Sequence, residues 1–482
     1  MNLTSTELAL ELPSNRTKIV ATIGPASHSP AVMEVMIRAG MTIARLNFSH
    51  GDFDSHGQVI ANLRVAAAAA GRQITVMADL PGPKIRIGQL VADPVELRAG
   101  DHFTLTTDDV VGSQQRASVT FDRLPRVVRP GDTLFLNDGY IQLEVVQVRG
   151  AEIECLVTVG GELRSRKGLN VPRIDLGISA FTQRDRECLA FALEHGVDAV
   201  SQSFVERAAE VHAVRQAARA LGHHPFVIAK IERARALENL DEILDAADGV
   251  MIARGDLGVE VPIETIALVQ KDLMRRANQR AKPIITATQM LESMATHPLP
   301  TRAEATDVAN AILDGTDCVM LSAESAMGKY PVEAVAMLAK IAATVEPTRR
   351  RIRLNELFAG TDLHEHVRPE HLMAAAVEAC FEHAAPAAVV VPTRSGASAR
   401  RIAQLRLPVW TIAVSSAQQT CQQVQFSYGV TAVHEANEPD DWNDYVRRRL
   451  LADSARHGLI LLTAGPSSKH PEDNYRLEII DV

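Results

Sequence analysis

Cysteine pairs, long apolar runs and aromatic residues are all scarce in this chain of 482 residues. Aromatic side chains make up 4% of it, and its five cysteines lie far apart, with no C-x-x-C pair. They are Cys155, Cys188, Cys318, Cys380 and Cys421. Scattered cysteines do not form a disulfide framework, and they suit a reducing compartment in which thiols serve as small buried apolar groups. We therefore expect a cytoplasmic protein.

A targeting signal and a membrane span are missing as well. The first 15 residues carry Glu7 and Glu11 and have neither a basic start nor a long apolar core, so they do not resemble a signal peptide. No apolar run approaches the length that crosses a bilayer. The net charge of -9 argues against nucleic acid, although a local basic pocket can still hold an anionic substrate. We expect residues 1–15 to be an N-terminal segment, and neither a membrane nor nucleic acid to be a partner.

What the sequence does contain is a recurring unit: a β-branched run, a polar tip and an amphipathic helical segment. Eight such runs begin at Lys18, Met41, Ile74, Val197, Phe226, Asp248, Lys282 and Thr316. Six of the seven intervals between them have the length of one strand-and-helix unit. Units in series predict an α/β fold, a closed (β/α)8 TIM barrel over residues 16–83 and 181–347.

The third interval is far too long for one such unit. Residues 84–180 alternate apolar and polar positions and are interrupted by the turn signals Arg98–Asp101, Arg129–Asp132 and Gly160–Gly161. These features predict an inserted all-β domain built from hairpins. An insertion after the third barrel strand lies over the C-terminal mouth of the barrel, where the chemistry of this fold takes place. We interpret residues 84–180 as a lid.

A third α/β pattern follows the barrel, over residues 348–482. A helix is expected over His371–Ala384, and strands are expected over Ala388–Pro392, Val409–Ser415 and Gly458–Thr463. The pattern predicts a small, mostly parallel sheet. Between the first of these strands and the next helix lie Thr393, Arg394, Ser395, Gly396, Ala397 and Ser398. Such a loop forms either a phosphate cradle or an ordinary capped turn, and the pattern alone favours neither.

Charged and polar residues gather where the barrel strands end, which is where a barrel carries its chemistry. Lys230 and Glu232 are two positions apart on one predicted strand and therefore point to the same face. Alone they would fit a buried ion pair that holds two strands together. The other strand ends supply Arg45, Asn47, Ser49, His50, Asp79, Lys84, Arg86, Arg254, Gly255, Asp256, Thr286, Thr288, Gln289, Ser322 and Glu324. Several cations, several acids and a helix start suit a phosphorylated carboxylic acid bound through a divalent metal.

The strand ends lie within longer motifs. They read TKIVATIGPAS, ARLNFSHG, KIE, MIARGDLGVE, ATQMLESM, PTRAEATDVANAILDGTDCVMLSAE and GKYPVEAV. Together these motifs, from Thr17 to Lys340, resemble the pyruvate kinase family. The resemblance implies transfer of a phosphoryl group from phosphoenolpyruvate to ADP, which gives pyruvate and ATP. It also implies a barrel, a lid and a regulatory C-terminal domain, a requirement for Mg2+ (Mn2+ is the alternative metal), and usually a homotetramer.

The resemblance assigns roles to individual residues. Arg45 would bind the transferring phosphate, and Lys230 would stabilise its charge and the charge of the enolate. Glu232 and Asp256 would hold the metal. The N–H groups of Gly255 and Asp256, together with Thr288, would receive the substrate carboxylate, and Thr288 matches a residue linked to protonation of the enolate. The nucleotide side would comprise Asn47, His50, Arg86 and, in the motif RKGLNVP, Lys167.

The chain departs from the family at two places. Met327 stands where many members have a lysine, which puts one phosphate contact in doubt. In K+-dependent members the cation is held by residues matching Asn47, Ser49, Asp79 and the carbonyl of Leu80, and a glutamate stands where this chain has Lys84 in DLPGPKIR. A lysine supplies a tethered ammonium close to K+ in size and charge. We therefore expect Lys84 to lie near Asp79 and K+ not to be required; the alternative is that Lys84 points to solvent.

The resemblance also implies regulation through the C-terminal domain, and two alternative functions are open to the same residues. The loop Thr393–Ser398 matches the one that holds a sugar phosphate in activated members, so we expect a phosphorylated effector there, with Trp442 and Arg447 as candidates for a second phosphate. One alternative function is a metal-dependent lyase in which Lys230 forms a Schiff base, but the adjacent Glu232 would keep the amine protonated. The other is an inactive metabolite sensor, although such a protein could lose Lys230 or Asp256.

Overall fold

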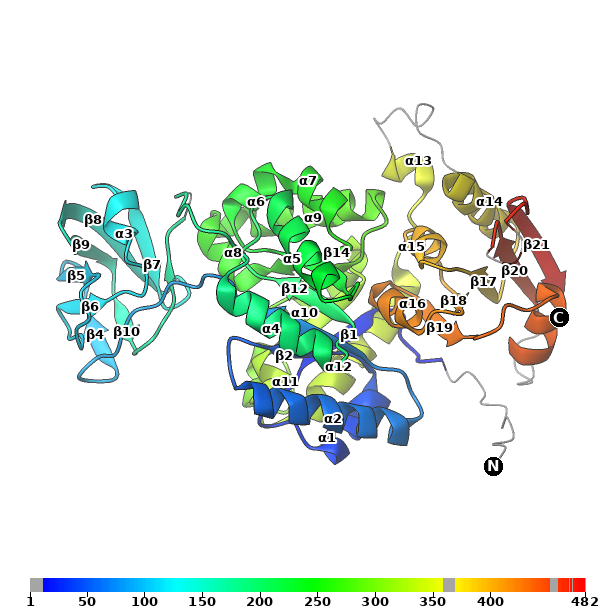
Figure 1. Ribbon diagram of the computed structural model, residues 1–482, viewed down its shortest axis with the longest axis horizontal. Coiled ribbons are helices and arrows are strands. Elements are labelled where there is room, and N and C mark those ends of the chain that lie inside the picture. Colours follow the sequence, from blue (N-terminus) through cyan, green and yellow to red (C-terminus); the bar gives the residue numbers. More distant parts are fainter. Residues whose placement is uncertain are drawn as a thin grey trace.

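The computed structural model describes residues 12–172, 174–358, 369–450, 458–467, 469 and 471–481. Its three parts follow one another along the long axis of the molecule, with a barrel in the middle, a β domain at one end and an α/β domain at the other (Figure 1). The two outer domains therefore cover opposite ends of the barrel. Among the described residues, no helix is long and apolar enough to cross a membrane.

The predicted barrel is confirmed. Eight parallel strands close in the order β1-β16-β15-β14-β13-β12-β3-β2. They are β1 (Lys18–Thr22), β2 (Met41–Asn47), β3 (Thr75–Leu80), β12 (Ala199–Gln202), β13 (Phe226–Ile231), β14 (Gly249–Ala253), β15 (Ile284–Ala287) and β16 (Cys318–Leu321). Nearly all their residues are buried, because helices cover the outside while other side chains fill the inside. Parallel strands with both faces covered read as continuous apolar runs, which is why the sequence revealed them.

Several helices of the outer ring begin or end at local capping signals. The ring contains α1 (Pro30–Ala39), α2 (Phe53–Ala70), α4 (Gln183–Glu194), α5 (Ala208–Ala220), α6 (Ala234–Glu238), α7 (Leu240–Ala246), α9 (Ile266–Gln279), α10 (Arg302–Asp314) and α12 (Pro331–Val345). In α10, Thr301 and Glu304 form a reciprocal capping box, and Gly315 ends the helix with a φ of +103°. Capping of this kind satisfies backbone groups that the helix itself leaves unpaired.

The inserted domain is a β structure with its own apolar core. One sheet has the order β11-β7-β8-β9-β5-β6, and a second pairs β10 with β4. Its strands are β4 (Val95–Leu97), β5 (His102–Thr106), β6 (Arg116–Ser118), β7 (Thr133–Leu136), β8 (Ile141–Arg149), β9 (Glu152–Val159), β10 (Gly161–Leu163) and β11 (Leu169–Asn170), with one short helix, α3 (Leu124–Val127). The chain leaves the barrel after β3 and returns before α4, so the domain lies at the carboxyl end of the barrel strands (Figure 1).

The C-terminal domain is a five-stranded sheet of order β19-β18-β17-β20-β21, in which only β21 is antiparallel. Its elements are α13 (Leu354–Leu357), α14 (Pro369–His383), β17 (Ala388–Pro392), α15 (Ala397–Ala403), β18 (Trp410–Ser415), α16 (Gln418–Gln423), β19 (Val430–His434), α17 (Trp442–Tyr445), β20 (Leu459–Ala464) and β21 (Arg476–Asp481). The expected mostly parallel sheet is confirmed. Its two edge strands, β19 and β21, were not predicted.

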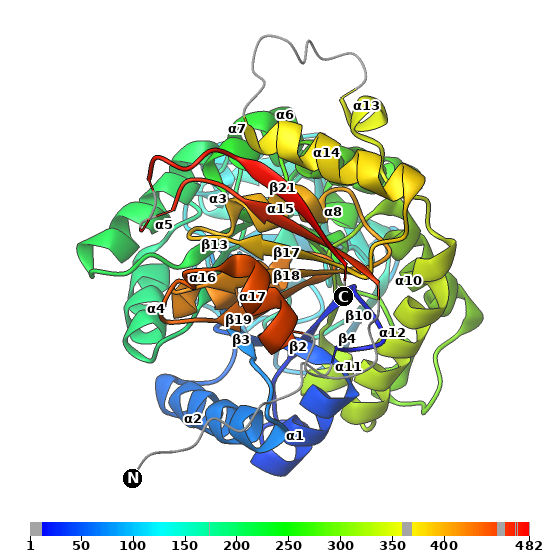
Figure 2. The same ribbon diagram turned by 90° about the vertical axis from the view of Figure 1, so that its right-hand side faces the viewer.

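The C-terminal domain closes the barrel at the end opposite the inserted domain (Figures 1 and 2). Phe426, which follows α16, is fully buried with the residues that line the bottom of the barrel, and its ring stacks on Phe226 with 5.0 Å between centroids. Beside it, the buried Arg406 forms an ion pair with Asp317 at the start of β16. An aromatic plug and a buried charge pair make this junction part of the barrel core.

Candidate active site

Asp79, at the end of β3, is the centre of a buried charge network. The Nε of Arg45, from β2, lies 2.9 Å from its Oδ2, and the Nη2 of Arg45 contacts the same oxygen. The Nζ of Lys230, from β13, lies 3.4 Å from its Oδ1. Burial alone would raise the pKa of Asp79, but the charges of Lys230 and Arg45 outweigh it and lower this pKa. The acid is therefore ionised and holds two cations toward the mouth of the barrel.

Lys230 also pairs with Glu232, the second acid in contact with it. Their Nζ and Oε1 atoms are 2.9 Å apart, and both side chains are buried. Burial favours a neutral lysine, but the negative charges of Asp79 and Glu232 overcome it and raise the pKa of Lys230. An ammonium held in this way is a fixed positive charge rather than a nucleophile, which argues against Schiff-base chemistry.

Glu232 and Asp256 are the two carboxylates expected to hold a metal. Burial raises the pKa of Glu232; the charge of Lys230 opposes this rise and that of Asp256 adds to it, so the two acids lie close enough to repel each other. The other Glu232 oxygen, Oε2, accepts the N–H of Phe204 at 2.7 Å. Among the described residues, no group of three or more His, Cys, Asp or Glu side chains is placed to hold an ion. Two carboxylates, with substrate and water as further ligands, fit the usual protein environment of Mg2+.

Lys84 does not lie where we expected it. Its Nζ forms an ion pair with Asp256, 3.3 Å from Oδ1, whereas Asp79 is paired with Arg45 and Lys230. The reason is that Asp79 is almost fully buried and already carries two cations, while Lys84 follows β3 on the half-exposed segment that leaves the barrel. The lysine is nevertheless a tethered cation of the site, and the alternative that it points only to solvent is wrong.

The start of α8 (Arg254–Glu260) is held by Thr288, which follows β15. The N–H of Gly255 donates to Thr288 Oγ1 at 2.8 Å, and this hydroxyl donates to the carbonyl of Ala287 at 2.7 Å. Thr288 has a φ of +65°, a left-handed conformation that is costly for a β-branched residue and often marks a functional site. The guanidinium of Arg254, the first residue of α8, joins the same segment: it donates to the carbonyl of Thr288 at 2.8 Å and pairs with Asp307 at 2.7 Å.

The expected nucleotide-side residues come from both domains. Asn47 and His50 follow β2, while Arg86 and Lys167 lie on paired segments of the inserted domain, joined by the bridge of Arg86 to Gly168. Burial lowers the pKa of His50, and the charge of Arg86 lowers it further, so this arginine lies near the barrel loop. Ser49 lies two residues after Asn47 and donates its N–H to Asn47 Oδ1 at 3.1 Å. It is exposed.

Other polar residues at the strand ends serve the structure instead. The hydroxyl of Thr286 bonds to that of Thr316 at 2.9 Å inside the barrel wall. Glu324 accepts two backbone N–H groups, from Ser322 at 2.7 Å and from Leu291 at 3.1 Å. Thr286 and Glu324 were candidates for chemistry, but their polar atoms form these structural hydrogen bonds.

Two hydroxyl residues at the end of β12 belong to the network but were not predicted from the sequence. The Oγ of Ser201 lies 2.6 Å from Asp79 Oδ1, and that of Ser203 lies 2.7 Å from Lys230 Nζ. Ser203 also donates to the carbonyl of Leu80 at 2.7 Å. Their spacing of two positions on a predicted strand was a usable signal, because it places both hydroxyls on one face.

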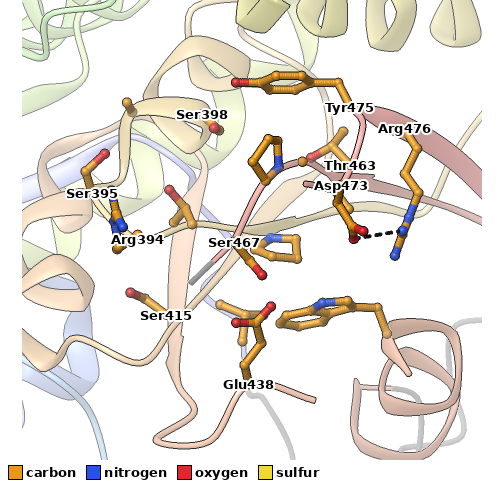
Figure 3. Close-up of a pocket in the computed structure, with 18 of the residues that line it drawn as sticks. Arg394, Ser395, Ser398, Ser415, Glu438, Thr463, Ser467, Asp473, Tyr475 and Arg476 are labelled. Atoms are coloured by element: carbon orange, nitrogen blue, oxygen red, sulfur yellow. Dashed lines mark hydrogen bonds and ion pairs between the residues drawn. The ribbon is translucent and has the colours of Figure 1, made fainter. Parts of the chain in front are cut away.

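A second candidate site is a cavity of about 700 Å³ in the C-terminal domain (Figure 3). The loop Thr393–Ser398 forms one side of it, with the side chains of Arg394, Ser395 and Ser398 at that end, and Trp442 and Tyr475 belong to the lining. Gly396 has a φ of +77°, and the N–H of this glycine is bonded to Thr393 Oγ1 at 3.0 Å. Arg447 does not line this cavity and bonds to the Asp481 carbonyl at 2.9 Å.

Comparisons with known proteins agree with this architecture. The family model "Pyruvate kinase, barrel domain" matches residues 14–335, and the model "Pyruvate kinase, alpha/beta domain" matches residues 370–472. The pyruvate kinase of Thermococcus litoralis is 48% identical over 422 residues, which cover 87% of this chain and 89% of the relative. That of Geobacillus stearothermophilus is 40% identical, covering 93% and 77%, and that of Mycobacterium tuberculosis is 38% identical, covering 94% and 95%.

Proposed function

The chain belongs to the pyruvate kinase family and is a phosphotransferase, and from that premise we propose how its residues carry the reaction. The substrates that the family implies are phosphoenolpyruvate and ADP. In the proposed reaction the bond between the phosphorus and the enol oxygen breaks, and a bond to the terminal phosphate oxygen of ADP forms. The enolate left behind takes up a proton at its methylene carbon and becomes pyruvate. Such a transfer needs positioning and charge stabilisation more than a protein nucleophile.

The single observation that supports this proposal is the buried network of ion pairs among Arg45, Asp79, Lys230 and Glu232, with Asp256 near Glu232. Arg45 and Lys230 are held by Asp79, so two cations are fixed before substrate arrives. In our proposal Arg45 binds the transferring phosphoryl group, and Lys230 stabilises its charge and that of the enolate. Preorganised charges are effective because they need no rearrangement during the reaction.

We assign the metal to Glu232 and Asp256; burial raises the pKa of Glu232, and the negative charge of Asp256 contributes to the rise. Bound Mg2+ (or Mn2+) would supply Lewis-acid stabilisation of the transferring group. Lys84 pairs with Asp256 and so holds one of these acids in place. In our proposal the N–H groups of Gly255 and Asp256 at the start of α8, together with Thr288, receive the substrate carboxylate, and Thr288 takes part in protonation of the enolate.

The test of this function is a steady-state assay of ATP and pyruvate formation from phosphoenolpyruvate and ADP, with and without Mg2+. Reduction with borohydride in the presence of pyruvate tests the alternative function, because a lyase that forms a Schiff base would be labelled at Lys230. Formation of ATP without trapping supports the proposal. Trapping at Lys230, or binding of phosphoenolpyruvate without turnover, would favour the lyase or the sensor.

We also propose that the inserted domain acts as a lid over nucleotide and substrate. The chain leaves the barrel through Gly82 and returns through Thr182, and both residues donate N–H groups to the carboxylate of Asp185, at 2.9 and 2.7 Å. Two adjacent crossings held at one point suit a hinge. Saturation with phosphoenolpyruvate, Mg2+ and ADP should reduce the radius of gyration in small-angle X-ray scattering, and an unchanged radius would count against closure.

Regulation by a phosphorylated metabolite is proposed for the cavity of the C-terminal domain. Its support is the hydroxyl-rich loop Thr393–Ser398 on one wall of a cavity large enough for a sugar phosphate or a nucleotide. A panel of phosphorylated sugars and nucleotides should include one that lowers the KM for phosphoenolpyruvate. Ser395→Asp should abolish that response through charge repulsion, whereas an unchanged response would place the effector elsewhere. We further propose a homotetramer, which light scattering coupled to gel filtration would measure.

A further inference from the structure

The fourth barrel strand, β12, contributes no charged side chain to the site, yet the segment that ends it contacts the main acids and the lysine. Ser201 bonds to Asp79, Ser203 bonds to Lys230, and the N–H of Phe204 bonds to Glu232. Phe204 has a φ of +58°, which turns its N–H toward that carboxylate. One short segment therefore contacts three charged groups of the proposed reaction.

Ser203 has the most specific geometry of these residues. Its side-chain oxygen accepts from Lys230 Nζ at 2.7 Å and donates its single proton to the carbonyl of Leu80 at 2.7 Å. Because the hydroxyl proton is committed to Leu80, the lone pairs of the oxygen face the ammonium. The residue is 3% exposed, so both bonds are shielded from bulk solvent. A neutral acceptor orients an ammonium without adding another negative charge to a site that must bind an anion.

The position of Ser203 is itself fixed from two sides. Gln202, fully buried, donates through Nε2 to the Ser203 carbonyl at 3.0 Å and to the Ala180 carbonyl at 2.8 Å, where the chain returns from the inserted domain. On the other side lies Gly82, where the chain leaves for that domain. A methyl group on Gly82 would come within 3.1 Å of Ser203 Cβ. Ser203 is thus packed between the two crossings of the hinge.

We propose that Ser203 is a positioning residue for Lys230: its hydroxyl, anchored on the last carbonyl of β3, aims the ammonium at the transferring phosphoryl group. This inference rests on the proposed role of Lys230. It differs from a purely structural role, which would affect stability but leave the chemistry unchanged. With the hydroxyl removed, Asp79 and Glu232 would draw the ammonium toward themselves, and the charge would lie deeper than the reaction needs.

The test compares Ser203→Ala with Ser325→Ala, a matched control. Ser325 is also fully buried and also donates to a strand-end carbonyl, that of Thr22 at 2.9 Å, but bonds to no catalytic side chain. Both variants should lose some thermal stability, because each loses a buried hydrogen bond to a strand-end carbonyl. Only Ser203→Ala should lower kcat, by about 10- to 100-fold, with the KM values for phosphoenolpyruvate and ADP nearly unchanged, because misplacement of a catalytic group affects the transition state.

Ser203→Thr provides a second readout, since it restores the hydroxyl and should recover most of the lost kcat. Equal kcat in Ser203→Ala and Ser325→Ala would overturn the proposal. A rise in KM that accounts for the whole loss of kcat/KM in Ser203→Ala would also overturn it. So would a Ser203→Thr variant that has the melting temperature of the wild type but the low kcat of Ser203→Ala. Lys230→Met, measured in parallel, separates the two claims. If that variant turns over normally, the role of Lys230 fails; if it is inactive while Ser203→Ala is normal, only the positioning role fails.

Discussion

Replacing Lys84 with glutamate should slow the enzyme and make the remaining activity depend on K+. Three cations, Arg45, Lys84 and Lys230, face three acids in the site, so Lys84→Glu changes a balanced set into one with two excess negative charges. The Nζ of Lys84 lies 3.3 Å from Asp256 Oδ1. At that distance a pair of unit charges interacts by about 1 kcal/mol in water and about 5 kcal/mol at an effective dielectric constant of 20.

The partial exposure of Lys84 and Asp256 decides where their interaction energy lies between these two values. The side chains of Lys84 and Asp256 are 28% and 22% exposed, so we take a value in the lower half of the range, about 2 kcal/mol. A stabilisation of this size, lost from the transition state, corresponds to about a 30-fold decrease in kcat/KM. The wild-type enzyme should run at near full rate in buffers free of K+ and NH4+, because its cation is tethered. K+ added to Lys84→Glu should restore part of the loss, since a free cation can then bind beside two neighbouring acids.

Lys271→Glu is the matched control for this experiment. Lys271 also pairs with an aspartate, Asp314, but lies on the outside of the barrel on α9. Its reversal should leave the steady-state rate and the response to K+ unchanged. Strong K+ activation of the wild-type enzyme would refute the reasoning, and so would a Lys84→Glu variant that behaves like Lys271→Glu.

Two further predictions concern stability. Phe426→Ala should lower the free energy of unfolding by about 3–5 kcal/mol, because the ring is fully buried against Phe226 at the base of the barrel. A denaturant titration that finds a loss of less than about 1 kcal/mol would contradict the packing role of this ring. Burial raises the pKa of Asp198 to about 6 from 3.8, so its contribution to stability is full below about pH 4 and is lost as pH rises through 6, by up to about 3 kcal/mol. Asp198→Asn, which keeps an acceptor for the N–H of Val76, should raise the melting temperature at pH 7 and flatten its pH dependence between 4 and 7. An unchanged pH profile would be inconsistent with a buried, proton-binding carboxyl.

The barrel and its charged residues could be predicted from the sequence because both leave local signals. Parallel strands buried on two faces read as apolar runs, and the residues that follow them must lie at one end of a barrel. Arg45, Lys230 and Glu232 were identified in this way. Glu324 was misread by the same rule, because a carboxylate that caps backbone N–H groups looks the same in sequence as one that meets a ligand.

The contacts that tertiary packing decides could not be predicted. The partner of Lys84 depends on the path of the chain as it leaves β3, which sequence spacing does not specify. The spacing of Ser201 and Ser203 places both hydroxyls on one face of the strand, but it does not show that Ser203 contacts Lys230. Phe426 reads as a residue of the C-terminal domain, and its place in the barrel core follows only from the docking of the two domains.

The most direct test of the account is the turnover of Lys230→Met, compared with its affinity for phosphoenolpyruvate in the presence of Mg2+. Calorimetry would measure the affinity, and a coupled assay of pyruvate formation would measure the rate. Methionine keeps much of the volume of the lysine side chain but removes the charge that Asp79 and Glu232 hold in place. The account predicts a loss of turnover of at least about 10²- to 10³-fold with binding largely retained. A variant that turns over within a few-fold of the wild type would contradict it.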